Sequence, residues 1–250
     1  MVKTFSRTKL LFISSYLSHE ILTTTRNKHK YLYIFMSNKK IITQTKNHLK
    51  RFLPADCTGH DWQHAERVMK MAFKIAVKEA KPVNKLVIAL AALLHDLEDW
   101  KFDSSNKIKT GKVRKWLVKL KLDPIIIAHV CTIIREMPFK GARVKNKMTT
   151  WEGKIVQDAD RLDAVGAIGI ARAFAYGGFK RRLIYNHRVN HKLHKTFTAY
   201  KKSNSSTINH FYEKLLLLKN RMNTKEARAI AKQRHKFMLD FLRQFFIDLA

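Results

Sequence analysis

The chain is poor in cysteine and in acidic residues, and it has no long apolar run. Its 250 residues include only 2 cysteines, Cys57 and Cys131, which is too few for a disulfide framework or a cysteine-based zinc site. Because this usage is typical of a reducing compartment, we expect a cytoplasmic protein. The apolar runs fall far short of the ~20 residues that cross a bilayer, which predicts no membrane span.

Basic residues far outnumber acidic ones. The chain has 50 Lys and Arg against 19 Asp and Glu, a formal net charge of +31 at pH 7. Such an excess favours a polyanionic partner or substrate, such as a nucleotide, another phosphoester, nucleic acid or an acidic membrane surface, without selecting one of them. A chain of this length can bury its core in one domain without a disulfide or a structural metal.

The first 35 residues differ in composition from the rest. They are rich in Ser, Thr and basic residues, contain one acid, Glu20, and show no sustained helical periodicity. A transit peptide has this kind of composition. The alternative, which we favour, is that Met36 is the true start, because a cleaner amphipathic pattern begins there. We therefore treat residues 1–35 as a basic N-terminal extension that need not belong to the native chain, and we predict one domain over residues 36–250.

From Ile41 onward, apolar residues recur mostly at spacings of three and four, which is the periodicity of packed helices. This pattern predicts an all-α fold of about eight or more helices. Three of the four prolines fall at predicted helix boundaries. The predicted helices cover residues 38–53, 60–80, 84–98, 107–120, 123–136, 150–175, 206–221 and 224–248. Residues 177–206 are predicted to form a long connection of low helical regularity.

Three segments place His or Asp side chains at the edges of otherwise apolar helices. They are TGHDWQHAERV, ALLHDLEDW after the apolar run LVIALAALL, and VQDADRLDAVGAIGIARA, which precedes a stretch of small residues. The histidines are His60, His64 and His95, and the carboxylates are Asp96, Glu98, Asp99, Asp158, Asp160 and Asp163. In a chain with so few acids, this grouping indicates that something holds the carboxylates in place.

A divalent metal ion would hold them. A buried carboxylate without a partner costs several kcal/mol or becomes protonated, so Asp96 and Asp160 should lie beside a cation or an arginine. Two imidazoles and two carboxylates form a mixed nitrogen and oxygen ligand set that suits Mn, Fe, Co, Ni or Zn. The ligand set alone does not choose among these metals.

These residues also resemble a known pattern. His64, the doublet His95-Asp96 and Asp160 in its Ala-Asp-Arg-Leu-Asp context are similar to the H…HD…D motif of the HD-domain superfamily of metal-dependent phosphohydrolases. The stretches GHDWQHAERV, LLHDLEDWKF, EGKIVQDADRLDAVGAIGIARAFAYGG and HFYEKLLLLKNRMNT more closely resemble a bacterial subgroup of small HD proteins that includes nucleotide pyrophosphohydrolases. The resemblance covers about Ser37 to the C-terminus, and it implies a helical fold around a metal site.

The resemblance implies a set of metal ligands. They are His64, His95, Asp96 and Asp160, and they would bind one divalent ion, which could be Mn, Mg, Co, Ni, Fe or Zn. His64 is preferred over His60 because the family's first histidine stands three residues before an Arg-Val pair. Asp160 is preferred over Asp158 because the family's aspartate follows a small residue.

The resemblance also implies roles beyond the metal ligands. Asp99 stands three residues after Asp96, where related enzymes carry an acidic residue close to the attacking water, so we expect it to orient or deprotonate that water. Phosphate charge must be stabilised by cations. The candidates for binding the substrate follow from their positions in the sequence and not from the resemblance. Arg67 and Lys101 lie closest to proposed ligands, Arg161 adjoins Asp160, and Lys140 belongs to a turn that could face the substrate.

Other polar residues are expected to have structural roles. Asp158 and Asp163 should support a ligand or cap a helix rather than bind the metal, and His60 could equally be a hydrogen-bonded helix-end histidine. The stretch HRVNHKLH, from His187 to His194, has a spacing that could bind a metal on a helix face. Because it lies among Arg and Lys in a poorly patterned segment, we expect a solvated basic loop instead.

The resulting prediction is a metal-dependent phosphohydrolase that acts on nucleotides by attack of a metal-activated water on phosphorus. If it behaves like the pyrophosphohydrolases it resembles, it cleaves a (deoxy)nucleoside triphosphate to monophosphate and pyrophosphate. A nucleotide phosphatase is the nearest variant. From another class, a basic nucleic-acid-binding protein that retains an HD scaffold also accounts for the charge. A homodimer is compatible with the sequence.

Overall fold

The computed structural model describes residues 37–53, 57–59, 61–98, 110–203 and 205–250. The chain divides into two compact units, Met1–Gln44 and Thr45–Ala250. Only residues 37–44 of the first unit are described, and they are helical. The second unit contains all the elements labelled α2 to α10.

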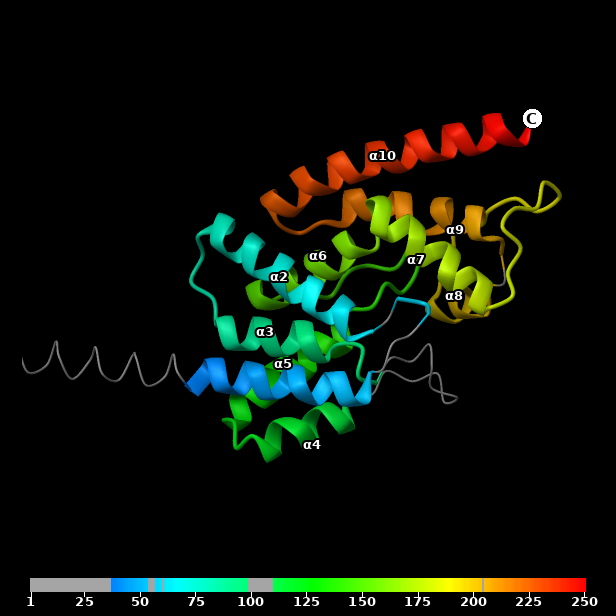
Figure 1. Ribbon diagram of the computed structural model, residues 1–250. Helices are drawn as coiled ribbons and strands as arrows, with labels where there is room; N and C mark the ends of the chain where they lie inside the picture. The colour runs from blue at the N-terminus through cyan, green and yellow to red at the C-terminus, as the bar shows by residue number, and fades with distance from the viewer. Residues whose placement is uncertain (1–36, 54–56, 60, 99–109, 204) are drawn as a thin grey trace, which may run out of the picture. The chain divides into compact units, whose positions relative to one another are not determined.

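Every regular element in these ranges is a helix, which confirms the prediction of an all-α fold (Figure 1). A helix covers residues 37–52. It is followed by α2 (Trp62–Glu79), α3 (Lys85–Leu94), α4 (Gly111–Lys119), α5 (Pro124–Glu136), α6 (Trp151–Asp163), α7 (Gly166–Phe179), α8 (Phe197–Lys202), α9 (Thr207–Glu213), the 3-10 helix η1 (Leu215–Arg221) and α10 (Lys225–Leu249). None of the described helices combines the length and the apolar character that a membrane crossing requires.

Helix α3 lies at the centre of the core. Its sequence KLVIALAALL is almost entirely apolar, and every residue from Leu86 to Leu94 is buried. A helix that is hydrophobic on all sides must be covered on all sides. Helices α2, α5 and α6 pack against it. The residues that directly follow α3, beginning with His95, therefore emerge next to the core.

Helix α2 begins at a side-chain cap that fixes the position of its first turn. The carboxylate of Asp61 accepts a hydrogen bond from the backbone nitrogen of His64 at 2.9 Å. Such a cap satisfies an amide that has no partner within the helix. Because α2 packs against both α3 and α6, the buried side chain of His64 lies where these three helices meet.

The predicted helix over residues 150–175 is in fact two helices, and the prediction of one continuous helix is wrong. Helix α6 ends at Asp163, and α7 begins at Gly166, whose φ is +80°. A β-carbon at Gly166 would also lie only 3.1 Å from Cγ of Arg234. Glycine tolerates both the left-handed backbone and the close approach. The chain therefore turns here, and α7 packs against α6, α9 and α10.

The structure also differs from the prediction at other places. The helix predicted at 84–98 ends at Leu94, because residues 95–98 form a turn. The helix predicted at 206–221 is α9 followed by η1, with the break at Lys214, whose φ of −141° is not helical. The connection predicted at 177–206 contains the short helix α8, which the Thr196 side chain caps.

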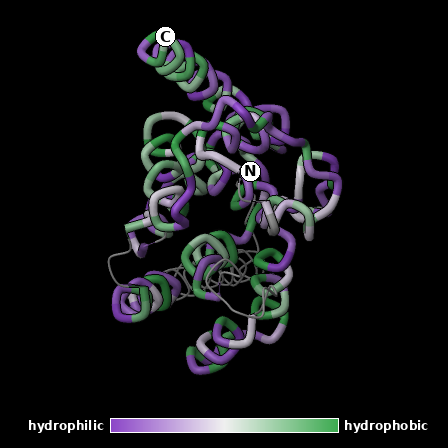
Figure 2. Tube along the Cα trace, turned by 90° about the vertical axis from the view of Figure 1, so that its right-hand side faces the viewer, coloured by the Kyte–Doolittle hydropathy of each residue, from purple (hydrophilic) through white to green (hydrophobic). Residues whose placement is uncertain are grey.

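Helix α10 is amphipathic, and hydrophobic and hydrophilic residues alternate along the helix that carries the C-terminus in Figure 2. The Thr224 side chain caps it by accepting a hydrogen bond from Ala227. The buried carboxylate of Asp158 in α6 accepts hydrogen bonds from the backbone nitrogens of Asn223 and Thr224, both at 2.8 Å. Asp158 therefore ties the start of α10 to α6, which is a structural role of the kind we expected.

Candidate metal centre

The four side chains predicted as metal ligands converge on one point. His64 comes from the first turn of α2, His95 and Asp96 directly follow α3, and Asp160 lies in the last turn of α6. The Nε2 atoms of His64 and His95 are 3.2 Å apart. Oδ2 of Asp96 lies 3.3 Å from Nε2 of His64, and its Oδ1 lies 3.3 Å from Nε2 of His95. Oδ1 of Asp160 lies 3.5 and 3.6 Å from the same two atoms.

These separations suit the shell of a single metal ion. Nitrogen and oxygen ligands bound at about 2.0–2.2 Å around one ion lie about 3.0–3.6 Å from one another. His64, His95 and Asp96 form the only metal-ligating group of this kind found among the described residues. Two imidazole nitrogens with carboxylate oxygens are also a chemically reasonable set for a divalent transition metal ion.

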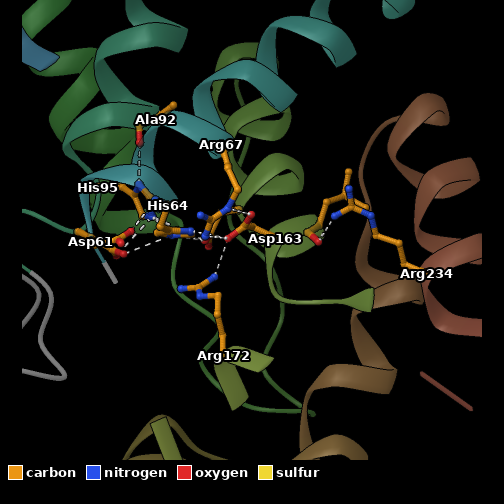
Figure 3. A network of polar contacts seen from close by, with 11 residues as sticks. Asp61, His64, Arg67, Ala92, His95, Asp163, Arg172 and Arg234 are labelled. Atoms are coloured by element: carbon orange, nitrogen blue, oxygen red, sulfur yellow. Dashed lines mark hydrogen bonds and ion pairs between the residues drawn. The ribbon is translucent and has the colours of Figure 1, made fainter. Parts of the chain in front are cut away.

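The outer nitrogen of each imidazole has its own acceptor. Nδ1 of His64 lies 2.7 Å from a carboxylate oxygen of Asp163 (Figure 3). Nδ1 of His95 lies 2.8 Å from the backbone oxygen of Ala92. A ring that donates its Nδ1 proton keeps a lone pair on Nε2 when it is neutral. Both rings are therefore oriented to offer Nε2 to the cluster.

The charges around the cluster favour a cation. Burial lowers the pKa of His64, but hydrogen bonds to neighbouring carboxylates, that of Asp160 foremost, outweigh burial and raise the pKa to about 10. Burial likewise lowers the pKa of His95, and the carboxylates of Asp96 and Asp160 more than offset this. Desolvation raises the pKa of Asp160, yet the two imidazoles bring it well below its usual range. A divalent ion can replace the imidazole protons as the source of positive charge.

The cluster lines a cavity of about 180 Å³. Apolar side chains such as Ile134, Met137 and Phe139 form part of its wall. Cations form another part, and they are Arg161, Arg172, Arg182 and Lys214. A cavity with this lining suits an anionic compound that also has an apolar portion.

The predicted substrate-binding residues have different surroundings in the structure. Arg161 lines the cavity, is 5% exposed, and donates from Nη1 to the backbone oxygen of Arg221; burial lowers its pKa to about 10. Arg67 does not line the cavity, because its guanidinium donates to Asp163 at 2.9 and 3.1 Å. Lys140 lines a second, smaller cavity together with Arg161 and Arg221.

Three of the predicted residues, His60, Asp99 and Lys101, lie outside the described residues, so their roles stay predictions. Glu98, from the same segment as Asp99, accepts hydrogen bonds from the backbone nitrogens at the start of α4. The carboxylates that follow α3 thus have different tasks: Asp96 belongs to the cluster, and Glu98 caps a helix.

The sequence analysis missed three of the cations in the cavity wall. Arg172 belongs to α7, Arg182 to the connection after it, and Lys214 follows α9. The only signal for them was the general excess of basic residues, which does not say where each side chain points. The stretch from His187 to His194 is a loop, and His187 and His191 are exposed, as expected. His194 differs, because its side chain is largely buried 3.7 Å from a carboxylate oxygen of Glu213.

Comparison with known proteins identifies the family. Residues 61–165 match the HD domain, a range that contains all four residues of the cluster. The uncharacterised protein YpgQ of Bacillus subtilis strain 168 is 36% identical over 215 residues, which are 86% of this chain and 96% of YpgQ. Three solved structures are also similar to this chain over most of its length.

One is a protein from Lactobacillus plantarum, with 33% identity, a TM-score of 0.75, and coverage of 83% of this chain and 96% of that one. Another is Bacillus subtilis YpgQ in complex with ADP, with 35% identity, a TM-score of 0.67, and coverage of 85% and 96%. A Bacillus thuringiensis structure described as an HD-superfamily hydrolase is 40% identical, with a TM-score of 0.63 and coverage of 85% and 98%. This chain therefore belongs to the HD-domain superfamily of hydrolases.

Proposed function

We propose that the protein is a metal-dependent phosphohydrolase that acts on nucleotides, with cleavage of a (deoxy)nucleoside triphosphate to monophosphate and pyrophosphate as its most specific form. The observation that carries this proposal is the convergence of two imidazoles and two carboxylates at 3.2–3.6 Å beside a cavity with cationic walls. Dephosphorylation of a nucleotide at its terminal phosphorus is the nearest variant.

The residues that would hold one divalent ion are His64, His95, Asp96 and Asp160. When bound, such an ion makes water acidic enough to act as a nucleophile near neutral pH and withdraws charge from a phosphate oxygen. Mn, Mg, Co, Ni, Fe and Zn are all compatible with this ligand set. The buried apolar helix α3, which directly precedes His95 and Asp96, limits the access of bulk water to them.

The cavity wall supports a nucleotide as the ligand. Arg161, Arg172 and Lys214 provide positive charge that would bind the phosphates. The apolar side chains around Phe139 offer a surface for a base. The crystal structure of the relative YpgQ with ADP agrees with a nucleotide ligand for this chain.

In the proposed reaction, the oxygen of water attacks phosphorus, and the bond from phosphorus to the leaving phosphate oxygen breaks. When the α-phosphorus is attacked, the electron pair of that bond leaves with pyrophosphate, and the water oxygen stays on the monophosphate. When the terminal phosphorus is attacked, the electron pair leaves with the oxygen of the remaining nucleotide or nucleoside, and the water oxygen stays on the released phosphate. Asp99 is predicted to orient the water or to accept its proton. The position of the phosphate chain relative to the cluster would decide between the two outcomes.

A metal analysis and a product screen test this proposal. The purified protein is analysed for bound metal and then assayed for phosphate and pyrophosphate release from nucleotides with Mn²⁺ or Mg²⁺. We expect His95→Ala to weaken metal binding by more than about 100-fold, beyond the loss typical of an outer partner, and to abolish turnover. His187→Ala, at an exposed histidine, should leave both unchanged. Turnover retained in His95→Ala would contradict the mechanism.

Nucleic-acid binding is a second candidate function, which the net charge of +31 favours. Such binding would rest on phosphate contacts and would weaken steeply with added salt. It would also persist in His95→Ala, because the cluster is not needed for it. Salt-sensitive binding of DNA or RNA without turnover of any nucleotide would favour this function over the hydrolase.

A further inference from the structure

Asp163 accepts four hydrogen bonds beside the cluster, although it is not one of the proposed ligands. It lies at the end of α6 and is 7% exposed. It accepts from Nδ1 of His64 at 2.7 Å, from Nε and Nη2 of Arg67 at 2.9 and 3.1 Å, and from Nη1 of Arg172 at 2.9 Å. Figure 3 shows Asp163 between these three side chains, which come from α2 and α7.

The break between α6 and α7 makes this arrangement possible. In one continuous helix, residues nine positions apart lie about 13.5 Å along the axis and on opposite faces. The turn that begins α7 at Gly166 instead brings Arg172 back to Asp163. From the other side, Gly59 approaches the stem of Arg172 so closely that a β-carbon there would lie 2.9 Å from Cγ. Arg172 is therefore held in one place while it lines the cavity.

The two arginines that contact Asp163 differ in one respect. Arg172 lines the cavity that contains the cluster, whereas Arg67 does not. The carboxylate thus connects a proposed metal ligand, His64, with one cationic residue of the cavity wall. Arg67 donates two hydrogen bonds to the carboxylate and compensates its buried negative charge.

We propose that Asp163 is a positioning residue with two tasks: it keeps the Nδ1 proton of His64 so that Nε2 stays available to a metal ion, and it holds Arg172 toward the phosphates of the substrate. Both tasks rest on the proposed function, the first on its metal ion and the second on its nucleotide substrate. Metal binding and substrate binding then depend on one carboxylate. An asparagine at this position has nearly the same shape but offers one oxygen in place of two, so it cannot serve all four donors.

Three variants, each made in the full chain, separate the two tasks. Asp163→Asn should weaken Zn²⁺ and Mn²⁺ binding about 10- to 100-fold by calorimetry, and it should also raise KM for the nucleotide. Arg172→Gln should raise KM about tenfold or more while metal affinity stays within about threefold. Arg67→Gln, which loses the same partner but does not face the cavity, should change neither by more than about threefold.

A spectroscopic measurement reports on His64 directly. In the Zn²⁺-loaded protein with ¹⁵N-labelled histidine, the Nδ1 proton of His64 should give a slowly exchanging signal, which His64→Gln identifies by its absence. Asp163→Asn should lose or strongly shift this signal. Asp158→Asn is the matched control, because Asp158 is a buried carboxylate of the same helix that contacts the start of α10 and not His64. It should lower stability but leave the signal and the metal affinity unchanged.

Each result decides a different claim. Metal affinity and the His64 signal unchanged in Asp163→Asn would overturn the positioning of His64. Equal KM values for Arg172→Gln and Arg67→Gln would overturn the substrate-facing task, and this pair decides that task even if Asp163→Asn does not fold. Failure of the wild-type protein to bind any metal would instead contradict the proposed function itself.

Discussion

The helical centre and the connection after α7 contrast in how their residues are held. In the centre, α2, α3 and α6 pack against one another, and α3 is buried from Leu86 to Leu94. In the connection, Leu183, Ile184, Val189 and Leu193 are between 42% and 63% exposed. The connection is held by polar contacts, such as the hydrogen bond from Asn209 to the backbone oxygen of Val189 at 2.8 Å, and by ring contacts, such as that of His191 with Tyr212.

The difference shows that the proposed metal ligands and part of the cavity wall come from differently packed regions. The proposed metal ligands lie on, or directly after, helices whose apolar side chains are closely packed in the core. Residues of the cavity wall such as Arg182 and Tyr200 stand on the connection and on α8. Substitutions in the centre should therefore affect stability more than substrate binding, and substitutions in the connection should affect substrate binding more than stability.

The largest expected difference between the two regions is in stability. Leu90→Ala removes a fully buried side chain from α3 and should lower the free energy of unfolding by about 2–5 kcal/mol. Leu193→Ala, at a leucine of the connection that is 42% exposed, should lower it by less than about 1 kcal/mol. Urea unfolding of the two variants measures both values. Similar losses would show that the connection is packed as tightly as the centre.

A smaller effect is expected from the residue that anchors the connection. The buried carboxylate of Glu213 accepts from the Lys192 backbone at 3.1 Å and from the Ser205 hydroxyl at 2.7 Å. Glu213→Ala leaves these donors without their partner, which should cost about 1–3 kcal/mol locally. Trypsin should then cleave after Lys192 at least about fivefold faster, while exposed Asp240→Ala serves as the control. Unchanged cleavage would mean that other contacts hold the segment.

The smallest expected effect concerns the substrate alone. Arg182 donates to the backbone oxygen of Ser203 at 3.0 Å, and its guanidinium carbon lies 5.8 Å from the ring centre of Tyr176. Arg182→Gln should raise KM about three- to tenfold and leave kcat within about twofold, because it removes charge from the cavity wall and not from the cluster. Arg188→Gln, at an exposed arginine of the same connection, is the control. An equal rise in KM for both would point to general electrostatic attraction.

The residues of the cluster could be predicted because they break a strong local pattern. His95 and Asp96 follow a run of apolar residues that must be buried, so their polarity needs an explanation. The resemblance to a known motif then singled out His64 and Asp160 from neighbours of the same type. No comparable pattern surrounds Arg172 or Lys214, which are basic residues in a chain that has 50 of them.

By itself, the sequence determined that the chain is helical and which short segments carry the polar residues of the cluster, because periodicity and composition are local properties of the chain. Only the tertiary structure decided which side chains contact one another. Asp163 and Arg172 belong to one continuous helix in the predicted pattern, and they meet at 2.9 Å because the backbone turns before α7 at Gly166. A contact of this kind depends on the direction of two helices, and that direction is set by packing against the rest of the molecule.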